Sequence, residues 1–587
     1  MPPVPDAPPA ILIDGVTRSF RAGGRTVTAV DGVGARAERG AVTGLIGPDG
    51  AGKTTLMRLC AGLLRAESGR IEVMGIDVGR DPAHAQARIG YMPQRFGLYE
   101  DLSVRENLDL YAELQGVPAS ERGARYDELL HMTGLGPFTG RLAGRLSGGM
   151  KQKLGLACTL VRAPELLFLD EPTVGVDPVS RRELWAIVGH LTRTANMTVL
   201  LSTSYLDEAE RCGAVLLMHE GRIIGADDPA SFTAGVAGHS FHVSADGIGK
   251  RRLHERLAGA PGVVDATIQG AYVRIVTETA APPSAAILLP DTAAARITPV
   301  PPRFEDSFVT LLKARGGAAA APFRPPAPGR ASGDGAEEVI AVRNLTRVFG
   351  TFRAVDDVSF SVRKGEIFGL LGANGAGKST TFRMLCGLLP PSGGTLQVAG
   401  YDLRHAAAAA RGRLGYMAQK FSLYGDLSVM ENLRFFSSAY RLRGALRRER
   451  IAWALEEFGL GPVSAATSRD LPLGYKQRLA LACALMHQPD ILFLDEPTSG
   501  VDPLARREFW HRINALAEAG VTVLVTTHFM EEAEYCDHLV IMAQGRILAA
   551  GDSESLKARL RTEGHPDPTM EDAFIALIEA AAPTRAA

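Results

Sequence analysis

The stretch Gly372–Thr380 reads G-A-N-G-A-G-K-S-T and decides the fold of the chain around it. It follows the apolar run Ile367–Leu371, typical of a buried strand, and precedes Thr381–Leu389, which has a helical pattern. A strand, a glycine-rich loop and a helix in this order form a P-loop, whose backbone N–H groups surround a polyphosphate. The helix N-terminus adds aligned peptide dipoles and free N–H donors. The stretch therefore predicts a nucleotide-binding site in an α/β domain.

The residue types of the loop match the needs of a bound triphosphate. Glycines let the backbone turn around the phosphates without a side chain in the way. A lysine reaches the β- and γ-phosphates, and the hydroxyl beside it ligates Mg²⁺. The residues predicted to bind the nucleotide are Gly372, Gly375, Gly377, Lys378, Ser379 and Thr380, with Ser379 also a ligand of Mg²⁺.

The loop occurs twice, as part of a longer internal repeat. Gly47–Thr55 reads G-P-D-G-A-G-K-T-T, and Lys53 lies 325 residues before Lys378. Three further motif pairs have the same offset, so the chain consists of two copies of one domain. These pairs are Tyr91–Tyr99 with Tyr416–Tyr424, Leu167–Thr173 with Leu492–Thr498, and Arg181–Trp185 with Arg506–Trp510. The nucleotide-binding residues predicted in the first copy are Gly47, Gly50, Gly52, Lys53, Thr54 and Thr55, with Thr54 as the Mg²⁺ ligand.

Length and composition limit what the chain can be. At 587 residues it is too long for a single core, and its 46% apolar and 22% charged residues are typical of globular protein. The net charge of −1 shows no basic excess, which argues against nucleic acid or the ribosome as a partner. No uninterrupted apolar run of about 18 residues is present, so no membrane span is expected. The six cysteines have no metal-ligand spacing and are expected to be buried thiols of a reducing cytoplasm.

Each copy alternates strand and helix patterns, which predicts an α/β fold with a largely parallel sheet. A mostly helical stretch, roughly 95–150 and 420–475, is expected to form an inserted subdomain in each copy. Residues 240–300 have no counterpart in the second copy and are expected to form a small β-α-β-β-α-β module. The expected organisation is a disordered tail over 1–10, a first nucleotide-binding domain over 11–235, the accessory α+β module over 240–314, a Gly/Ala/Pro linker over 315–337 and a second nucleotide-binding domain over 338–587.

In both copies an aliphatic run ends in Asp-Glu. A buried strand places its last residues at the C-terminal edge of the sheet, beside the P-loop, where open α/β sheets bind ligands. Asp170 and Asp495 are therefore predicted to ligate Mg²⁺, directly or through water. Glu171 and Glu496, the next residues, are predicted to polarise the attacking water.

Two further residue pairs are candidates for the same sites. Gln94 and Gln419, in the pattern Y-M-x-Q, are predicted to ligate Mg²⁺ and to contact the γ-phosphate. Phe20 and Phe349, in the pattern Thr-Arg-x-Phe, can stack on adenine, which is worth about 1–3 kcal/mol for a base on an aromatic face. The second pattern fits a core phenylalanine at an exposed edge nearly as well.

Taken in order, these motifs resemble the nucleotide-binding domains of ATP-binding cassette (ABC) ATPases. The set includes L-S-G-G-M-K-Q at Leu146–Gln152 and the histidine-containing segment Thr526–Glu534, and it covers nearly the whole chain twice. The resemblance implies two domains that face each other head to tail. Each ATP then lies between the P-loop of one domain and the signature L-S-G-G of the other, within the same chain. Ser147, Gly148 and Gly149 are accordingly predicted to contact the γ-phosphate.

The two copies depart from the family pattern at different motifs. The second copy reads L-P-L-G at its signature: Pro472 removes a hydroxyl and an N–H, and Leu473 adds bulk. The first copy has Ser204 where the second has His528, which is predicted to bond the γ-phosphate and act in catalysis. In the head-to-tail arrangement both losses fall on one site. We therefore expect one hydrolytic site, with Glu496 and His528, and one site that mainly holds ATP, where the intact Glu171 allows slow hydrolysis.

The segments after the glutamines, Phe96–Leu108 and Phe421–Leu433, resemble those of the ABC-2 branch, which exports drugs and lipids. This resemblance implies a peripheral subunit at the cytoplasmic face of the inner or plasma membrane. Two integral-membrane permeases, on separate chains, are expected to dock near the two glutamine loops. The alternatives are a soluble tandem ABC ATPase acting on ribosomes, which the Gly/Ala/Pro linker disfavours, and a fused sugar-importer ATPase, which a periplasmic binding protein would identify.

Overall fold

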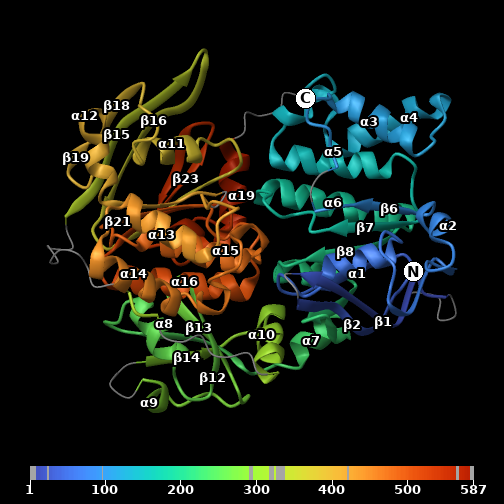
Figure 1. Ribbon diagram of the computed structural model, residues 1–587, viewed down its shortest axis with the longest axis horizontal. Coiled ribbons are helices and arrows are strands. Elements are labelled where there is room, and N and C mark those ends of the chain that lie inside the picture. Colours follow the sequence, from blue (N-terminus) through green and yellow to red (C-terminus); the bar gives the residue numbers. More distant parts are fainter. Residues whose placement is uncertain are drawn as a thin grey trace. The chain divides into compact units, whose positions relative to one another are not determined.

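The computed structural model describes residues 8–22, 25–94, 97–289, 295–315, 323–325, 337–419, 422–562 and 567–581. They form two compact units, Met1–Ala237 with Pro302–Phe308, and Gly238–Pro301 with Val309–Ala587 (Figure 1). We call the first unit the first cassette. In the second unit, residues 240–299 form the accessory module and residues 337–581 the second cassette. Most of the expected disordered tail and of the expected linker lies outside the described residues.

The larger sheet of the first cassette has the strand order β10-β9-β3-β8-β7-β6. All its pairs are parallel except that of β9 with the edge strand β10. β3, β7 and β8 are buried along their whole length, as expected of parallel strands covered on both faces. The strands are β3 (Val42–Ile46), β6 (Ile89–Met92), β7 (Leu166–Asp170), β8 (Thr198–Thr203), β9 (Ala214–His219) and β10 (Arg222–Asp227).

A smaller antiparallel sheet, in the order β2-β1-β4-β5, completes the core of the first cassette. The P-loop helix α1 (Lys53–Cys60) contacts strands of both sheets, and its buried Leu56, Met57 and Leu59 belong to one apolar cluster with them. Burying each such side chain contributes about 1.5–3 kcal/mol. The P-loop is therefore fixed by the core that the two sheets share. The strands are β1 (Ile11–Ala22), β2 (Arg25–Ala37), β4 (Ser68–Val73) and β5 (Ile76–Asp77).

A helical subdomain is inserted between β6 and β7, where the sequence predicts it. Its first helix begins with a capping box, in which Ser103 and Glu106 bond each other's backbone N–H groups. It contains α3 (Val104–Leu114), α4 (Ala119–Thr133), the short helices η1 (Gly136–Phe138) and η2 (Ala143–Arg145), and α5 (Gly148–Leu160). The remaining helices of the first cassette are α2 (Pro82–Gln86), α6 (Pro178–Ala195), η3 (Leu206–Arg211) and α7 (Pro229–Ala234).

The second cassette repeats this architecture element for element. Its sheets have the orders β20-β21-β22-β17-β23-β24 and β16-β15-β18-β19. The strands are β15 (Glu338–Phe349), β16 (Phe352–Arg363), β17 (Ile367–Gly372), β18 (Gly393–Val398), β19 (Tyr401–Asp402), β20 (Leu414–Met417), β21 (Ile491–Asp495), β22 (Thr522–Thr527), β23 (His538–Ala543) and β24 (Arg546–Gly551). The helices are α11 (Lys378–Leu385), α12 (Leu403–Arg411), α13 (Val429–Ala439), α14 (Gly444–Glu457), η4 (Gly461–Val463), η5 (Ser468–Asp470), α15 (Leu473–Leu485), α16 (Pro503–Glu518), α17 (Met530–Ala533), α18 (Ser553–Ala558) and α19 (Met570–Ala581).

The accessory module has the element order expected from the sequence. It contains β11 (Ser240–Ala245), α8 (Lys250–Ala258), β12 (Val263–Gln269), β13 (Tyr272–Thr277), α9 (Ala285–Leu288) and β14 (Ala295–Pro299), with the sheet order β12-β13-β11-β14. Phe241, Leu253, Leu257 and Ile275 form part of its own apolar core. After it, α10 (Phe304–Ala314) begins on the first cassette, where the Ser307 hydroxyl donates to the Phe232 carbonyl at 2.7 Å.

The accessory module packs on the second cassette, although it follows the first cassette in the sequence. Lys250 Nζ donates to the carbonyl oxygens of Glu534 at 2.8 Å and Cys536 at 2.7 Å. Arg251 pairs with Asp537, and Asp265 pairs with Arg507 of α16. These partly buried polar contacts hold the module on the second cassette, and both belong to the second unit.

Part of the expected linker also packs on the second cassette. Phe323 is buried, with its ring centroid 5.6 Å from that of Phe458. Trp453 of α14 donates its ring N–H to the Arg324 carbonyl at 3.1 Å. Residues 323–325 are therefore held against α14. Among the described residues, no helix combines the length and apolarity that a bilayer crossing requires.

Candidate functional site

The two P-loops form open cradles at the start of α1 and α11. Gly377, the N-cap of α11, has φ of 100°, and no side chain caps the helix. A Cβ at this position would lie 2.6 Å from the Ala354 carbonyl oxygen, so only glycine fits. Gly52 has φ of 103° and meets the Ala29 carbonyl oxygen in the same way, at 2.1 Å. The first N–H groups of both helices are left for a ligand, as phosphate binding requires.

The P-loop lysines are buried and lie over the loops. Lys378 Nζ donates to the Gly372 carbonyl at 2.6 Å and to the Ala373 carbonyl at 3.1 Å. Lys53 Nζ donates to the Gly47 carbonyl at 2.7 Å and lies 3.2 Å from Glu171 Oε1. Each ammonium group is thus held where the phosphates of a nucleotide would enter the cradle. This geometry fits a bound nucleoside triphosphate.

The aspartates at the ends of β7 and β21 lie beside the P-loop helices. Thr54 Oγ1 donates to Asp170 Oδ1 at 3.1 Å, which joins the two predicted Mg²⁺ ligands of the first cassette. The donor set is a hydroxyl and a carboxylate, the hard oxygen ligands that Mg²⁺ prefers. Burial raises the pKa of the Asp495 carboxyl, and the hydrogen bond from Thr526 opposes that rise. Ser379 and Asp495 provide the same donor types in the second cassette.

The structure reveals supporting hydroxyls that the sequence motifs did not indicate. Ser202 Oγ donates to Asp170 Oδ1 at 2.6 Å, and Thr526 Oγ1 donates to Asp495 Oδ1 at 2.6 Å. In each sheet the hydroxyl residue is the register partner of the aspartate on the neighbouring parallel strand. Each cassette has a Ser or Thr at this position of the neighbouring strand, so the repeat indicates that a hydroxyl is needed there. Its contact with the aspartate follows only from the strand register.

The glutamates that follow the aspartates are held in an unusual backbone conformation. Glu171 and Glu496 have φ of 49° and 46°, in the left-handed region that non-glycine residues rarely adopt. In the second cassette the Glu496 N–H donates to both the carbonyl and the side-chain oxygen of Thr526, each at 3.0 Å. Strain of this kind costs about 1–3 kcal/mol and persists where the surrounding structure holds it. Both glutamates are therefore fixed in place.

The glutamines contact these glutamates. Gln94 Nε2 donates to Glu171 Oε2 at 2.9 Å, and Gln419 Nε2 donates to Glu496 Oε2 at 2.6 Å. The Y-M-x-Q pattern predicts a contact with Mg²⁺ and phosphate but not with the glutamate. The amide nitrogen is used in this bond, so the amide oxygen remains as the atom able to ligate a cation.

The histidine position distinguishes the two cassettes. His528 is buried, and its Nδ1 lies 3.2 Å from Glu496 Oε2. Burial raises the pKa of the Glu496 carboxyl, but His528, Lys378 and Gln419 together hold it below its ordinary value. In the first cassette Ser204 is also buried, and its hydroxyl has no hydrogen-bond partner among the described residues. Of the two cassettes, the second alone places an imidazole beside its glutamate.

At the signature it is the first cassette that keeps the polar residue and the second that lacks it. Ser147 is the N-cap of α5, and its hydroxyl accepts a bond from the Met150 N–H at 3.3 Å. Pro472 is the N-cap of α15 and offers no side-chain bond. A prolyl ring also has no N–H, so this helix start lacks two of the polar groups present in the first cassette.

The comparisons with known proteins agree with this geometry. The ABC transporter family model matches residues 30–174 and 355–499. The chain is 54% identical over 540 residues to "Probable multidrug ABC transporter ATP-binding protein YbhF" of Escherichia coli (strain K12), which covers 92% of this chain and 93% of the relative. The chain belongs to the ABC transporter ATP-binding proteins.

Single-cassette relatives match as well. The Nod factor export ATP-binding protein I of Cupriavidus metallidurans is 44% identical over 219 residues, 37% of this chain and 72% of the relative. The linearmycin resistance ATP-binding protein LnrL of Bacillus subtilis is 39% identical over 223 residues, 38% of this chain and 72% of the relative. This ABC protein therefore binds ATP and is an ATPase, and proteins of its kind work with transmembrane permease subunits.

The candidate adenine-stacking residues of this ABC ATPase lie near the ends of β1 and β15. Phe20 is 37% exposed and Phe349 is 45% exposed. An arginine guanidinium covers each ring, with Arg18 at 5.0 Å and Arg347 at 4.6 Å from the ring centroids. Stacking on adenine remains a prediction for both, and one face of each ring already has a cationic neighbour.

The two signatures of this ABC ATPase also differ in packing, which gives a first prediction. A Cβ at Gly149 would lie 2.2 Å from Ser180 Oγ, whereas a Cβ at the equivalent Gly474 would lie 3.5 Å from the Ala505 Cβ. Gly149→Ala should destabilise the first cassette by about 1–3 kcal/mol through overpacking, and Gly474→Ala should be neutral within about 1 kcal/mol. Thermal unfolding of the two variants measures this difference, and equal shifts in Tm would contradict it.

Proposed function

We propose that the chain is the ATP-hydrolysing subunit of an ABC-2 type membrane exporter, with one catalytic and one degenerate composite ATP site. The observation that carries this proposal is that each cassette has lost a different motif. The first cassette lacks the histidine, and the second lacks the serine and first glycine of the signature. In a head-to-tail pair both losses fall on the same composite ATP site, because the P-loop of the first cassette faces the signature of the second.

In the proposed catalytic site, the second cassette contributes the P-loop and the carboxylates. Glu496 polarises the attacking water, supported by the nearby His528 and by Gln419. Lys378 binds the β- and γ-phosphates. Mg²⁺ held by Ser379, Asp495 and Gln419 neutralises charge that develops on the phosphate oxygens. Ser147, Gly148 and Gly149 complete the site from the first cassette.

In the proposed degenerate site, the first cassette contributes the P-loop. Lys53, Thr54, Asp170 and Gln94 retain the residue types needed to hold ATP and Mg²⁺. Glu171 is present, but Ser204 stands where the second cassette has its histidine. The facing signature consists of Pro472, Leu473 and Gly474. This site mainly binds ATP and hydrolyses it slowly.

Export is supported by the relatives, whose names include multidrug transport and Nod factor export. A docking surface for permeases is supported by exposed aromatic residues after the glutamines. Tyr424 is 50% exposed and Phe435 is 42% exposed, with ring centroids 4.5 Å apart, and Tyr99 of the first cassette is 57% exposed. We place two permeases, on separate chains, at these segments, with the ATPase at the cytoplasmic face of the membrane and a multidrug or other small-molecule substrate.

Affinity purification of the chain from detergent-solubilised membranes of its source cells tests the proposal. The expected result is co-purification of two multi-span permeases without a periplasmic binding protein. A binding protein among the partners would instead establish a sugar-importer type of transporter. Recovery with ribosomal proteins, and absence from the membrane fraction, would overturn the transport function and leave only the ATPase chemistry.

A further inference from the structure

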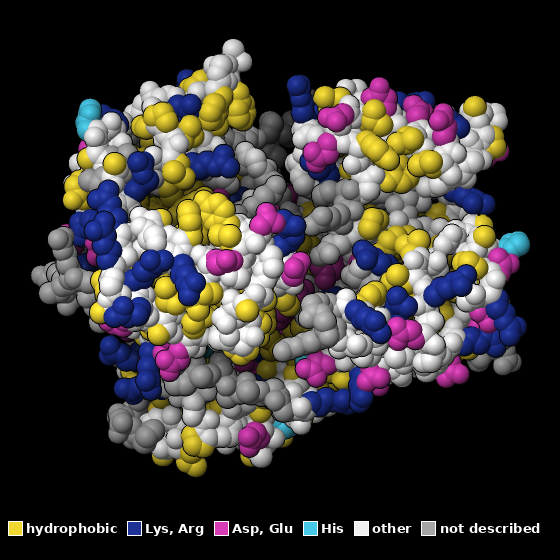
Figure 2. All heavy atoms as spheres, in the orientation of Figure 1, with side chains coloured by type: hydrophobic (Ala, Val, Ile, Leu, Met, Phe, Trp, Pro, Cys, Tyr) yellow, Lys and Arg dark blue, Asp and Glu magenta, His cyan; other side chains and the backbone are white. Residues whose placement is uncertain are grey.

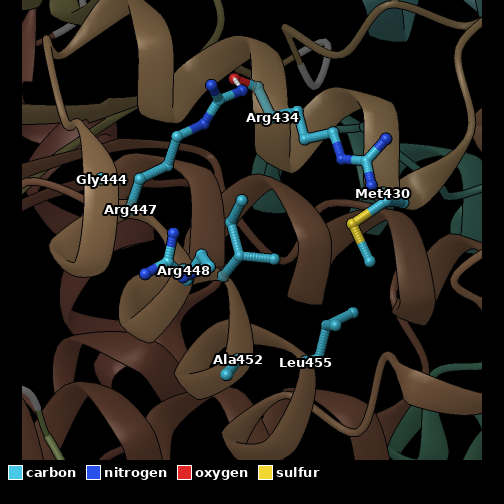
Figure 3. A pocket seen from close by; sticks show the side chains of 8 residues that line it. Met430, Arg434, Gly444, Arg447, Arg448, Ala452 and Leu455 are labelled. Atoms are coloured by element: carbon cyan, nitrogen blue, oxygen red, sulfur yellow. Dashed lines mark hydrogen bonds between the residues drawn. The ribbon is translucent and has the colours of Figure 1, made fainter.

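A pocket of about 600 Å³ opens between α13 and α14 in the helical subdomain of the second cassette. Figure 3 shows arginine side chains from both helices around it, with Met430 and Leu455 beside them. Figure 2 shows basic side chains gathered over this part of the second cassette, next to hydrophobic ones. The lining residues are Met430, Arg434, Gly444, Arg447, Arg448, Ile451, Ala452 and Leu455.

The residues that line the pocket include three arginines and no acidic residue. Arg447 is held by its own contacts, with Nε donating to Ser437 Oγ at 3.1 Å and Nη2 donating to the Arg434 carbonyl at 3.0 Å. The side chains of Arg434 and Arg448 make no hydrogen bond or ion pair with any described residue. The acid nearest along α13, Glu431, accepts hydrogen bonds from the backbone and hydroxyl of Ser428. These bonds and, to a smaller extent, the charge of Arg434 lower the pKa of its carboxyl.

The first cassette has a different arrangement at the same place. Tyr126, the counterpart of Ile451, is fully buried and donates its hydroxyl to the Leu108 carbonyl at 3.1 Å. Arg105 lies over the Tyr126 ring at 4.6 Å and pairs with Asp109 at 3.4 Å. Asp109 is the counterpart of Arg434. An aromatic ring and an ion pair thus occupy, in the first cassette, the position that is open and cationic in the second.

We propose that this pocket binds an acidic and apolar cytosolic segment of one permease, so that the two permeases dock unequally. The inference rests on the proposed function and specifies its partner surface. A carboxylate fits the guanidinium groups, which bind carboxylates through paired N–H donors. An adjacent apolar side chain fits the Met430, Ile451 and Leu455 surface. In the first cassette the arginines at this place, Arg105 and Arg122, are paired with Asp109 and Glu113. The first cassette therefore holds its permease by the exposed surface after Gln94.

The pocket is also connected to the catalytic glutamine loop. Asn432 of α13 is fully buried and exchanges hydrogen bonds with the backbone of Tyr424, at 3.0 and 3.1 Å. Tyr424 lies five residues after Gln419, which bonds Glu496. A permease segment held by α13 therefore acts on the helix that is fixed to the segment following Gln419.

The repeat supplies variants that test the proposal. Arg434→Asp and Ile451→Tyr introduce the residues that the first cassette carries at these positions, so both are compatible with the fold. The double variant should retain about tenfold less permease on affinity purification of the co-expressed transporter. Rising salt should lower permease retention by the wild type as well, because it screens the arginine charges. Its permease-free ATPase rate should equal that of the wild type. Arg559→Asp makes the same change of charge outside the pocket and should retain permease fully.

A photo-crosslinker in place of Ala452 identifies the occupant. Crosslinking to an acidic cytosolic segment of a permease is the expected result. Crosslinking to lipid or to another protein, or unchanged permease retention by the double variant, would overturn the pocket assignment while leaving the transport function standing. A wild-type chain that retains no permease at all would overturn the proposed function, and the pocket assignment with it.

Discussion

Replacing Glu496 by Gln is expected to abolish most ATP turnover of the chain, whereas replacing Glu171 by Gln is expected to spare much of it. An amide cannot accept a proton from the attacking water, and loss of a general base lowers the rate by about 10²–10⁴. Glu496 has His528 at 3.2 Å and a pKa below its ordinary value, which keeps it ionised and able to act. Glu171 faces a site with Ser204 instead, so less turnover depends on it.

Steady-state phosphate release from the two variants, each with its permeases, measures this difference. The two substitutions are matched, because each removes one charge at the end of an equivalent strand and each glutamate bonds an equivalent glutamine. ATP binding to both variants serves as the control, since Lys53 and Lys378 remain. Equal loss of turnover in both variants would show that the sites work alike.

Exchanging the signatures is the second change with a large expected effect. Ser147→Pro with Gly148→Leu gives the first cassette the signature residues of the second. In the proposed arrangement this removes the γ-phosphate contacts of the catalytic site, and loss of one such donor costs about 10²–10³ in rate. The structure adds a local reason, because Pro cannot replace the Ser147 hydroxyl that accepts from Met150. Turnover should fall to near the level of Glu496→Gln.

The reciprocal exchange, Pro472→Ser with Leu473→Gly, is its control. It repairs the signature of the degenerate site but leaves Ser204 without the histidine, so turnover should rise little. Adding Ser204→His to that variant should raise it further. If the first exchange left turnover intact, the signature of the first cassette would not serve the hydrolytic site.

The sequence is enough to predict the family, the fold class and the ATPase activity, because the motifs that indicate them are local and repeated. The P-loop, the terminal Asp-Glu of a buried strand and the glutamine recur at one offset, and parallel strands end at one edge of a sheet. The structure brings Thr54 to Asp170 at this edge. The bond from Gln94 to Glu171 was not predicted, and the contacts of these residues with nucleotide and Mg²⁺ stay predictions. The membership of the chain in the ABC transporter ATP-binding proteins confirms the predicted family and ATPase activity.

Contacts between distant segments could not be predicted in this way. The accessory module follows the first cassette in the chain, and only the folded structure shows Lys250 on the carbonyls of Glu534 and Cys536. The pocket beside Arg434 could not be predicted from the sequence either. The helices α13 and α14 have the same helical pattern as their counterparts and differ from them only at single positions. The difference between Tyr126 and Ile451 becomes informative only when both are placed on the same helix face.

The most direct test of the central claim is a single-turnover measurement on the complete transporter with both sites filled by ATP. Rapid quenching of the complex counts the ADP formed in the first phase. One catalytic and one degenerate site predict that half of the bound ATP is hydrolysed in that phase and the other half much later. Conversion of all bound ATP in one phase would contradict the account, because it would show that the site with Ser204 and Pro472 hydrolyses ATP as fast as the site with His528 and Ser147.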